Sequence, residues 1–196
     1  MNSRKLQALE TKSKIVNSFS ALLEESDFNS ITIRAICKHA NVSIGSFYTY
    51  FKSKDSVLME LEDRLDQIFI SSDTLEMDDL EASEKIIELL KRVVDKATAR
   101  EIVTLKYLYS SYLFTKKSPF ISKERGQYIT IDAIIVSGQN ENSITSEMHS
   151  NNITRNLIRF IRGIVFDWLI LEGEYDIKSV LTEELERYLT LYKVNS

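Results

Sequence analysis

The most informative part of this 196-residue sequence is residues 32–58, which read TIRAICKHANVSIGSFYTYFKSKDSVL. Two segments within it, about 32–40 and 43–51, have the pattern of short helices, and the turn between them is too tight for parallel packing. In such a pair one helix braces the other, which can then enter the major groove of DNA. We therefore expect a helix-turn-helix that binds DNA.

The second of these helices has two different faces. Phe47 and Phe51 lie four residues apart, and they are predicted to anchor the helix to a core that includes Ile15 and Phe19. The opposite face carries hydroxyl groups that suit phosphate oxygens, and Gly45 allows a close approach of the backbone to DNA. Thr32 and Ser43 are predicted to cap the two helices, and Lys54 lies beside the N-terminus of the next helix. Together with these three, the predicted DNA-binding residues are Thr32, Ser43, Ile44, Gly45, Ser46, Tyr48, Thr49, Tyr50 and Lys54.

A longer run around this helix has a family resemblance. The run Val42–Phe51, VSIGSFYTYF, followed by the basic segment Lys52–Lys54, closely resembles the turn, the recognition helix and the start of helix four in the TetR family of bacterial regulators. Many members of that family have Thr, Leu and His or Tyr where this chain has Ser46, Phe47 and Thr49. The resemblance implies an all-helical homodimer whose variable C-terminal part holds a small-molecule pocket.

The scarcity of turn-forming residues supports a helical fold. One proline and five glycines in the whole chain favour long helices over a sheet protein. Apolar periodicity predicts helices at about 11–26, 32–40, 43–51, 53–69, 80–96, 99–115, 122–140, 152–172 and 177–193, with Pro119 as a helix breaker. The expected fold class is all-α: an N-terminal three-helix helix-turn-helix domain joined by a long helix to a C-terminal helical ligand-binding and dimerisation domain.

The sequence predicts two domains, a helix-turn-helix DNA-binding domain at 1–53 and a helical ligand-binding and dimerisation domain at 54–196. The charged residues are unevenly distributed along the chain. Residues 1–54 contain eight Lys or Arg and four Asp or Glu, a net charge of +4, whereas the remaining residues carry −8. Only the N-terminal part is therefore expected to meet phosphate.

Apolar and aromatic side chains in the later helices are candidates for the pocket and the dimer contact that the resemblance implies. The predicted ligand-binding residues are Tyr109, Tyr112, Tyr128, Phe166 and Trp168. Aromatic residues at helical spacing also fill cores, so both readings stay open. The predicted dimer-interface residues are Ile161, Val165, Leu181, Leu185, Tyr188, Leu189 and Tyr192. The alternative is that these stripes close the core of a single chain.

Other classes of function find little support in the sequence. There is no pairing of a nucleophile with a histidine and no phosphate loop, so we expect neither an enzyme nor a cofactor. Cys37 is the single cysteine, and His39 and His149 lie far apart, so no metal site is expected. The absence of a signal peptide and of a membrane-spanning stretch predicts a cytoplasmic protein with no membrane partner.

These features predict a repressor that binds a palindromic DNA operator as a homodimer. A small hydrophobic or amphipathic effector of unknown identity is expected to release it from DNA. The alternative is an architectural or interaction protein that uses the same DNA-binding part without a ligand.

Overall fold

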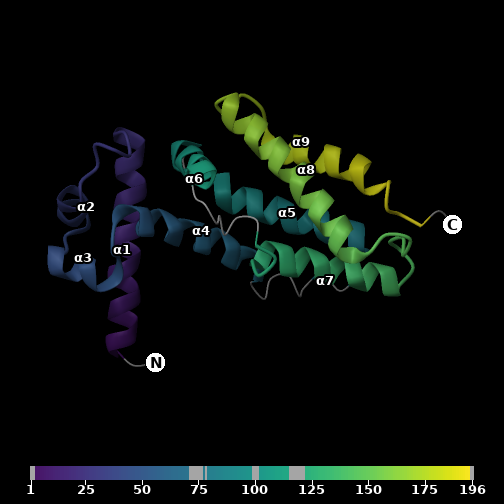
Figure 1. Ribbon diagram of the computed structural model, residues 1–196, viewed down its shortest axis with the longest axis horizontal. Helices are drawn as coiled ribbons and strands as arrows, with labels where there is room; N and C mark the ends of the chain where they lie inside the picture. Colours follow the sequence, from purple (N-terminus) through teal and green to yellow (C-terminus); the bar gives the residue numbers. More distant parts are fainter. Residues whose placement is uncertain (1–2, 71–76, 78, 99–101, 115–121, 195–196) are drawn as a thin grey trace. The chain divides into compact units, whose positions relative to one another are not determined.

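The described part of the chain is helical. In the computed structural model it comprises residues 3–70, 77, 79–98, 102–114 and 122–194 (Figure 1). Its helices are α1 (Ser3–Glu25), α2 (Ile33–Ala40), α3 (Ile44–Tyr50), α4 (Lys54–Ile70), α5 (Ala82–Thr98), α6 (Ile102–Phe114), α7 (Gly126–Asn140), α8 (Ser150–Ile170) and α9 (Ile177–Leu189). Within these ranges there is no β-strand, only an isolated bridge between Ile144 and Lys193. The all-α prediction is confirmed.

Three helix boundaries differ from the predicted ones by four residues or more. α1 begins at Ser3 and not near residue 11, and its first turns are mostly exposed, so no apolar periodicity marks them. α7 begins at Gly126, because Arg125 is extended and serves as its N-cap. α9 ends at Leu189, where the chain turns, and the carbonyl of Tyr192 then accepts a hydrogen bond from the amide of Thr145, 2.7 Å away. Pro119 lies outside the described residues.

Contacts divide the chain into two compact units. The first, called the head below, contains the described residues as far as Arg64 together with Val103–Ser111. The second, called the body, contains the described residues of Leu65–Ile102 and of Tyr112–Ser196. Both α4 and α6 therefore contribute residues to each unit. The domain boundary after residue 53 stays a prediction, because contacts between residues do not test which parts of the chain fold independently.

The head is built on α1. α2 and α3 pack against it and lie on the same side of it in Figure 1. Ile15, Phe19, Ile36 and Phe47 are fully buried, so the core forms from the side chains that helical periodicity assigns to it. α2 ends at Asn41, which adopts the left-handed conformation (φ 53°) that a helix C-terminus commonly requires.

The body packs α5, α7, α8 and α9 against one another. Its core includes the fully buried side chains of Ile86, Ile131, Ile135 and Leu157. α7 crosses closely at Gly138, where an added Cβ would lie 2.5 Å from the Cβ of Ala82. This close crossing requires glycine because any side chain at that position would overlap α5.

The C-terminal part of α4 caps the start of α7. The carboxylate of Asp66 accepts hydrogen bonds from the amides of Gly126 (2.8 Å) and Gln127 (3.1 Å), and it lies 3.3 Å from Nε of Arg125. These amides are the first ones of α7, which have no partner within the helix. A negative charge is favourable there because it also opposes the positive end of the helix dipole.

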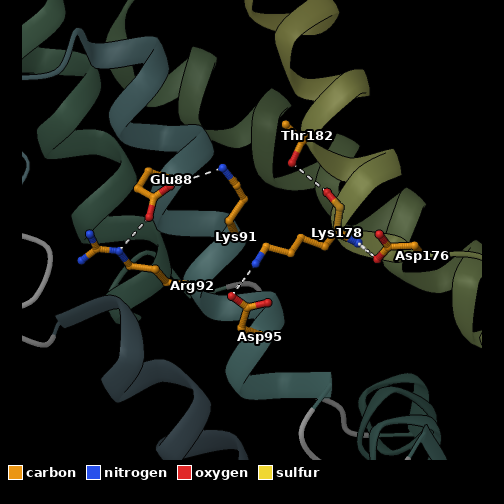
Figure 2. A network of polar contacts seen from close by, with 7 residues as sticks. All are labelled: Glu88, Lys91, Arg92, Asp95, Asp176, Lys178 and Thr182. Carbon is orange, nitrogen blue, oxygen red and sulfur yellow. Dashed lines mark hydrogen bonds and ion pairs between the residues drawn. The ribbon is translucent and has the colours of Figure 1, made fainter.

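A polar network joins α9 to α5 on the surface of the body. Figure 2 shows Lys178 of α9 reaching Asp95 of α5, with Nζ 2.6 Å from Oδ2. Asp176 caps α9 by accepting the amide of Lys178, and Thr182 donates to the carbonyl of the same lysine. The paired side chains are 39% and 55% exposed, so this ion pair adds little to the free energy of unfolding.

No helix in the described ranges is both long and apolar enough to cross a membrane.

Candidate nucleic-acid interface

The turn between α2 and α3 is organised by two capping hydroxyl groups. Oγ1 of Thr32 accepts the amide of Ala35 at 3.1 Å, and Oγ of Ser43 accepts the amide of Ser46 at 3.0 Å. Both caps were predicted from the sequence, and both are confirmed. Each cap satisfies an amide that has no partner within its own helix, which fixes where α2 and α3 begin.

α3 buries one side chain and presents its other face to solvent. Phe47 is fully buried and contacts the rings of Tyr48 and Phe51 at centroid distances of 5.6 and 5.8 Å. On the outer face Ile44 is 44% exposed and Tyr48 is 56% exposed. Ser43, Gly45 and Thr49 are exposed as well, whereas Ser46 and Tyr50 are half-buried. A seven-residue helix held by Phe47 and by Phe51, which is buried directly after it, thus leaves a continuous outer face open to a partner.

The hydroxyl groups of this face are not equally available. Thr49 donates to the carbonyl of Gly45 at 3.0 Å, and the hydroxyls of Ser43 and Ser46 lie 2.9 Å apart. The hydroxyl of Tyr48 makes no hydrogen bond to another of the described residues. Because a phosphate oxygen can only accept, Tyr48 is the best placed of these residues to donate to it.

Lys54 faces the head's own backbone. Its ammonium donates to the carbonyls of Phe28 and Ile31 and lies 4.3 Å from the centre of the Phe28 ring. Two of its three donors are therefore engaged inside the head. The predicted phosphate contact is left with one donor, and the main role that the structure shows for Lys54 is to hold the α1–α2 loop against α4.

Three exposed cations near the helix-turn-helix were not among the predicted site residues. Arg34 and Lys38 lie on α2, and Lys52 follows α3 directly. Arg34 and Lys38 had only their charge as a signal in the sequence, which does not tell a phosphate contact from an ordinary solvated side chain, whereas Lys52 also belongs to the basic segment of the family resemblance. Exposure next to α3 makes Lys52 the strongest addition to the predicted site.

Cys37 lies in the core of the head. Its side chain is 3% exposed, and burial raises the pKa of its thiol. A buried thiol held in its neutral form is a poor nucleophile. Within the described ranges, no three His, Cys, Asp or Glu side chains come together as a metal site requires.

The predicted ligand-binding aromatics belong to both compact units. Tyr109 is half-buried and belongs to the head, whereas the other four belong to the body. The hydroxyl of Tyr128 donates to the backbone and side-chain oxygens of Asn151, both at 3.0 Å, and burial raises its pKa. Nε1 of Trp168 donates to the carbonyl of Tyr175 at 3.0 Å. Tyr112 is buried, and Phe166 is 51% exposed.

The predicted dimer-interface residues lie mostly inside the body. Ile161, Leu181, Leu185, Leu189 and Tyr192 are at most 7% exposed within the single chain, and Val165 and Tyr188 are half-buried. The ring of Tyr188 stacks on that of Phe160 at 4.2 Å. Burial and a hydrogen bond with Tyr192 raise the pKa of Tyr188 to about 12. The five buried side chains therefore pack the core of the body, as in the alternative reading of the stripes, because a covered side chain has no area left to contribute to an interface.

The exposed apolar positions of α8 lie on its other side. Phe166 is 51% exposed and Ile170 is 59% exposed, and Arg155, Arg159 and Gly163 are exposed along the same row. These positions recur at intervals of three and four residues, which places them on one face of the helix. Sequence periodicity found the apolar character of α8 but not which of its sides is left uncovered.

The N-terminal part of the chain matches known regulators. The family described as "Bacterial regulatory proteins, tetR family" matches residues 17–61. The HTH-type transcriptional regulator UidR of Escherichia coli (strain K12) is 30% identical over 61 residues, which are 31% of this chain and 31% of that protein. The chain thus spans about a third of the length of this relative.

Solved structures resemble nearly the whole chain. The transcriptional regulator FadR from Bacillus subtilis, in complex with stearoyl-CoA, has a TM-score of 0.74 at 19% identity, over 91% of this chain and 97% of that one. Thermus thermophilus FadR, a repressor in complex with lauroyl-CoA, has a TM-score of 0.65 at 22% identity, over 92% of each chain. A regulator from Haloarcula marismortui has a TM-score of 0.74 at 17% identity, over 94% and 98% of the two chains. At such identities the likeness shows the fold.

Proposed function

Because the chain belongs to the TetR family of bacterial transcriptional regulators, we propose that it is a repressor that binds a near-palindromic operator as a homodimer. A small hydrophobic or amphipathic effector would release it, and the protein would act in the cytoplasm, where the DNA lies. The observation that carries the proposal is the outer face of α3, which is exposed while its anchors Phe47 and Phe51 are buried.

Recognition would take place with α3 in the major groove. Tyr48 would donate to a phosphate, and Ile44 would contact a base edge such as the methyl group of thymine. Gly45 would let the first turn of α3 approach the DNA backbone closely. The remaining predicted contacts are Thr32, Ser43, Ser46, Thr49, Tyr50 and Lys54, to which the exposed Lys52 is added.

Two copies are needed to read a palindromic site. Their recognition helices would sit about 34–36 Å apart, in successive major grooves on one side of the duplex. The dimer contact would use the exposed row of α8 that contains Phe166 and Ile170, with the half-buried Val165 and Tyr188 at its edge. Phe166 and Ile170 are two large apolar side chains exposed one helical turn apart, and neighbouring exposed apolar side chains are typical of a surface that a partner covers.

The first effector class to test is long-chain acyl-CoA. Two structures with the same fold contain stearoyl-CoA and lauroyl-CoA. To release DNA, the effector must bind the DNA-free conformation better than the DNA-bound one, and bound DNA must weaken effector binding by the same factor.

The experiment is a selection of bound fragments from the source genome at two salt concentrations. Recovery of a short inverted repeat, with an affinity that falls steeply at higher salt, would support a dimeric operator-binding protein.

Tyr48→Ala is expected to lower operator affinity about tenfold with its fold and dimerisation retained. Leu113→Ala is the control, because it removes another large exposed side chain (78% exposed), and this one lies in the body. Operator affinity unchanged by Tyr48→Ala would refute the assignment of α3.

The alternative is a DNA-binding protein that responds to no ligand. Thermal unfolding with stearoyl-CoA and with a panel of hydrophobic compounds separates the two functions, because a ligand that binds the folded state raises the unfolding temperature. A shift with any of them supports the ligand-responsive repressor, and no shift with all of them supports the alternative.

A further inference from the structure

Part of α6 is built into the head. Val103–Ser111 contacts the N-terminal residues more than it contacts the body, although it lies about 40 residues further along the chain than Arg64. Thr104, Leu105 and Leu108 are at most 5% exposed. The head therefore has a structural component from a helix that otherwise belongs to the body.

Two polar bridges tie α6 to the end of α1. Oγ1 of Thr104 donates to a carboxylate oxygen of Glu24 at 2.7 Å, and the hydroxyl of Ser20 lies 3.2 Å from the same Thr104 oxygen. One turn further along α6, the hydroxyl of Tyr107 donates to Oδ1 of Asp27 at 2.8 Å. It also accepts the backbone amide of Phe28 at 3.1 Å. Tyr107 thus uses its hydroxyl as donor and as acceptor on two consecutive residues of the α1–α2 loop.

Phe28 connects these bridges to the rest of the head. Its ring lies 5.8 Å from that of Tyr107 and 6.0 Å from that of Phe19 in the α1 core. Lys54, the first residue of α4, lies 4.3 Å from the centre of the same ring and donates to the carbonyls of Phe28 and Ile31. The α1–α2 loop therefore contacts α1, α4 and α6 at one residue.

The same loop leads directly into the helix-turn-helix. Ile31 is 4% exposed, and the next residue, Thr32, caps α2. A displacement of Phe28 would shift the carbonyl of Ile31 that Lys54 holds, and with it the start of α2. α2 packs against α3, so this displacement would reach the recognition helix.

We infer that Tyr107 is a positioning residue for DNA binding, which holds the α1–α2 loop and links the position of α6 to that of the helix-turn-helix. The inference rests on the proposed function, because it requires that α3 binds DNA. Linkage is reciprocal, so DNA bound at α3 must in turn stabilise the first half of α6.

The test is hydrogen–deuterium exchange of the full chain, free and bound to the operator duplex recovered by the genomic selection. In the unsubstituted protein, DNA is expected to slow exchange in residues 44–50, in residues 26–31 and in residues 103–111. In Tyr107→Phe, which keeps the ring and its packing, the slowing at 103–111 is expected to disappear. Operator affinity is expected to fall roughly fivefold, at the low end of couplings between sites.

Three further variants make the result specific to this contact. Ser110→Ala is the matched control, because that hydroxyl donates to the carbonyl of Tyr107 within α6, and it is expected to leave every readout unchanged. Asp27→Ala removes the exposed acceptor but leaves the hydroxyl of Tyr107 to accept the amide of Phe28, so its effect is expected to have the same direction as that of Tyr107→Phe and to be smaller. The double variant should weaken operator binding no more than Tyr107→Phe alone, because that substitution already removes the hydrogen bond to Asp27.

The outcomes separate this inference from the proposed function. Slowed exchange in 44–50 with unchanged exchange in 103–111 would overturn the inference and leave the DNA-binding site intact. A Tyr107→Phe protein that matches the unsubstituted one in all three segments would overturn it as well. If DNA changes none of the segments and no operator is recovered, the proposed function itself fails.

Discussion

α3 and α9 are both short helices, but they are held in opposite ways. α3 buries Phe47 alone and leaves its outer face exposed. α9 buries Ile177, Leu181, Leu185 and Leu189 along one side, so that its apolar stripe is covered by the body. The exposed side chains of either helix can change at little cost in stability, but α3 exposes most of its residues whereas α9 exposes a minority of its own. The side chains of α3 are therefore free to serve a partner, and those of α9 serve the fold.

The largest effect is expected from breaking the α9 stripe. Leu185 is 1% exposed, so Leu185→Ala should lower the free energy of unfolding by about 2–5 kcal/mol through lost burial and a residual cavity. Urea unfolding followed by circular dichroism measures the change. Glu183→Ala on the exposed side of α9 is the control and should shift the free energy by less than about 0.5 kcal/mol. A similar loss for both variants would mean that α9 is not held by its stripe.

The comparison also explains which features could be predicted from the sequence. The caps Thr32 and Ser43, the turn and the anchors Phe47 and Phe51 are all set by residues within a few positions of one another. Local backbone chemistry determines them, so one segment was enough to place the helix-turn-helix and its outer face.

The body depends on contacts between distant segments. The stripe of Leu181, Leu185 and Leu189 was correctly placed on one face of a helix, but periodicity does not tell whether that face meets the same chain or a second copy. The two halves of α6 likewise have similar apolar patterns, and only the fold shows that Tyr107 belongs to the head. Sequence periodicity thus predicted which side of a helix is buried more reliably than it predicted the segment against which that side packs.

Two glycines in the first turns of their helices differ in how much space surrounds them, Gly126 in α7 and Gly45 in α3. A Cβ added at Gly126, the first residue of α7, would lie 2.4 Å from Cγ1 of Ile70 and 3.0 Å from the carbonyl oxygen of Asp66. Gly126→Ala should therefore disturb the capping of α7 by Asp66 and lower the free energy of unfolding by about 1–3 kcal/mol. Urea unfolding measures the loss, and stability equal to that of the unsubstituted protein would show that α4 adapts at this point.

Gly45, the second residue of α3, is the open member of this pair. An added Cβ would come no closer than 3.7 Å to another atom, at Oγ of Ser43. Gly45→Ala is expected to leave the protein as stable as before or to stabilise it by up to about 1 kcal/mol, because alanine favours the helix. Operator affinity, measured by fluorescence anisotropy, should nevertheless fall several-fold, because the new methyl group occupies space that DNA needs. An unchanged affinity would place the DNA contact elsewhere on α3.

The smallest effect is expected from the ion pair between α9 and α5. Lys178 and Asp95 are 2.6 Å apart but 39% and 55% exposed, so solvent screens their attraction, and the pair should contribute about 0.2–1 kcal/mol (Figure 2). A double-mutant cycle with Lys178→Ala and Asp95→Ala, measured by urea unfolding, isolates this energy from the other contacts of each residue. A small coupling that shrinks further at high salt would show that the buried stripe, and not the polar network beside it, holds α9 in place. A coupling as large as the loss in Leu185→Ala would reverse that order and make the network the main attachment of the helix.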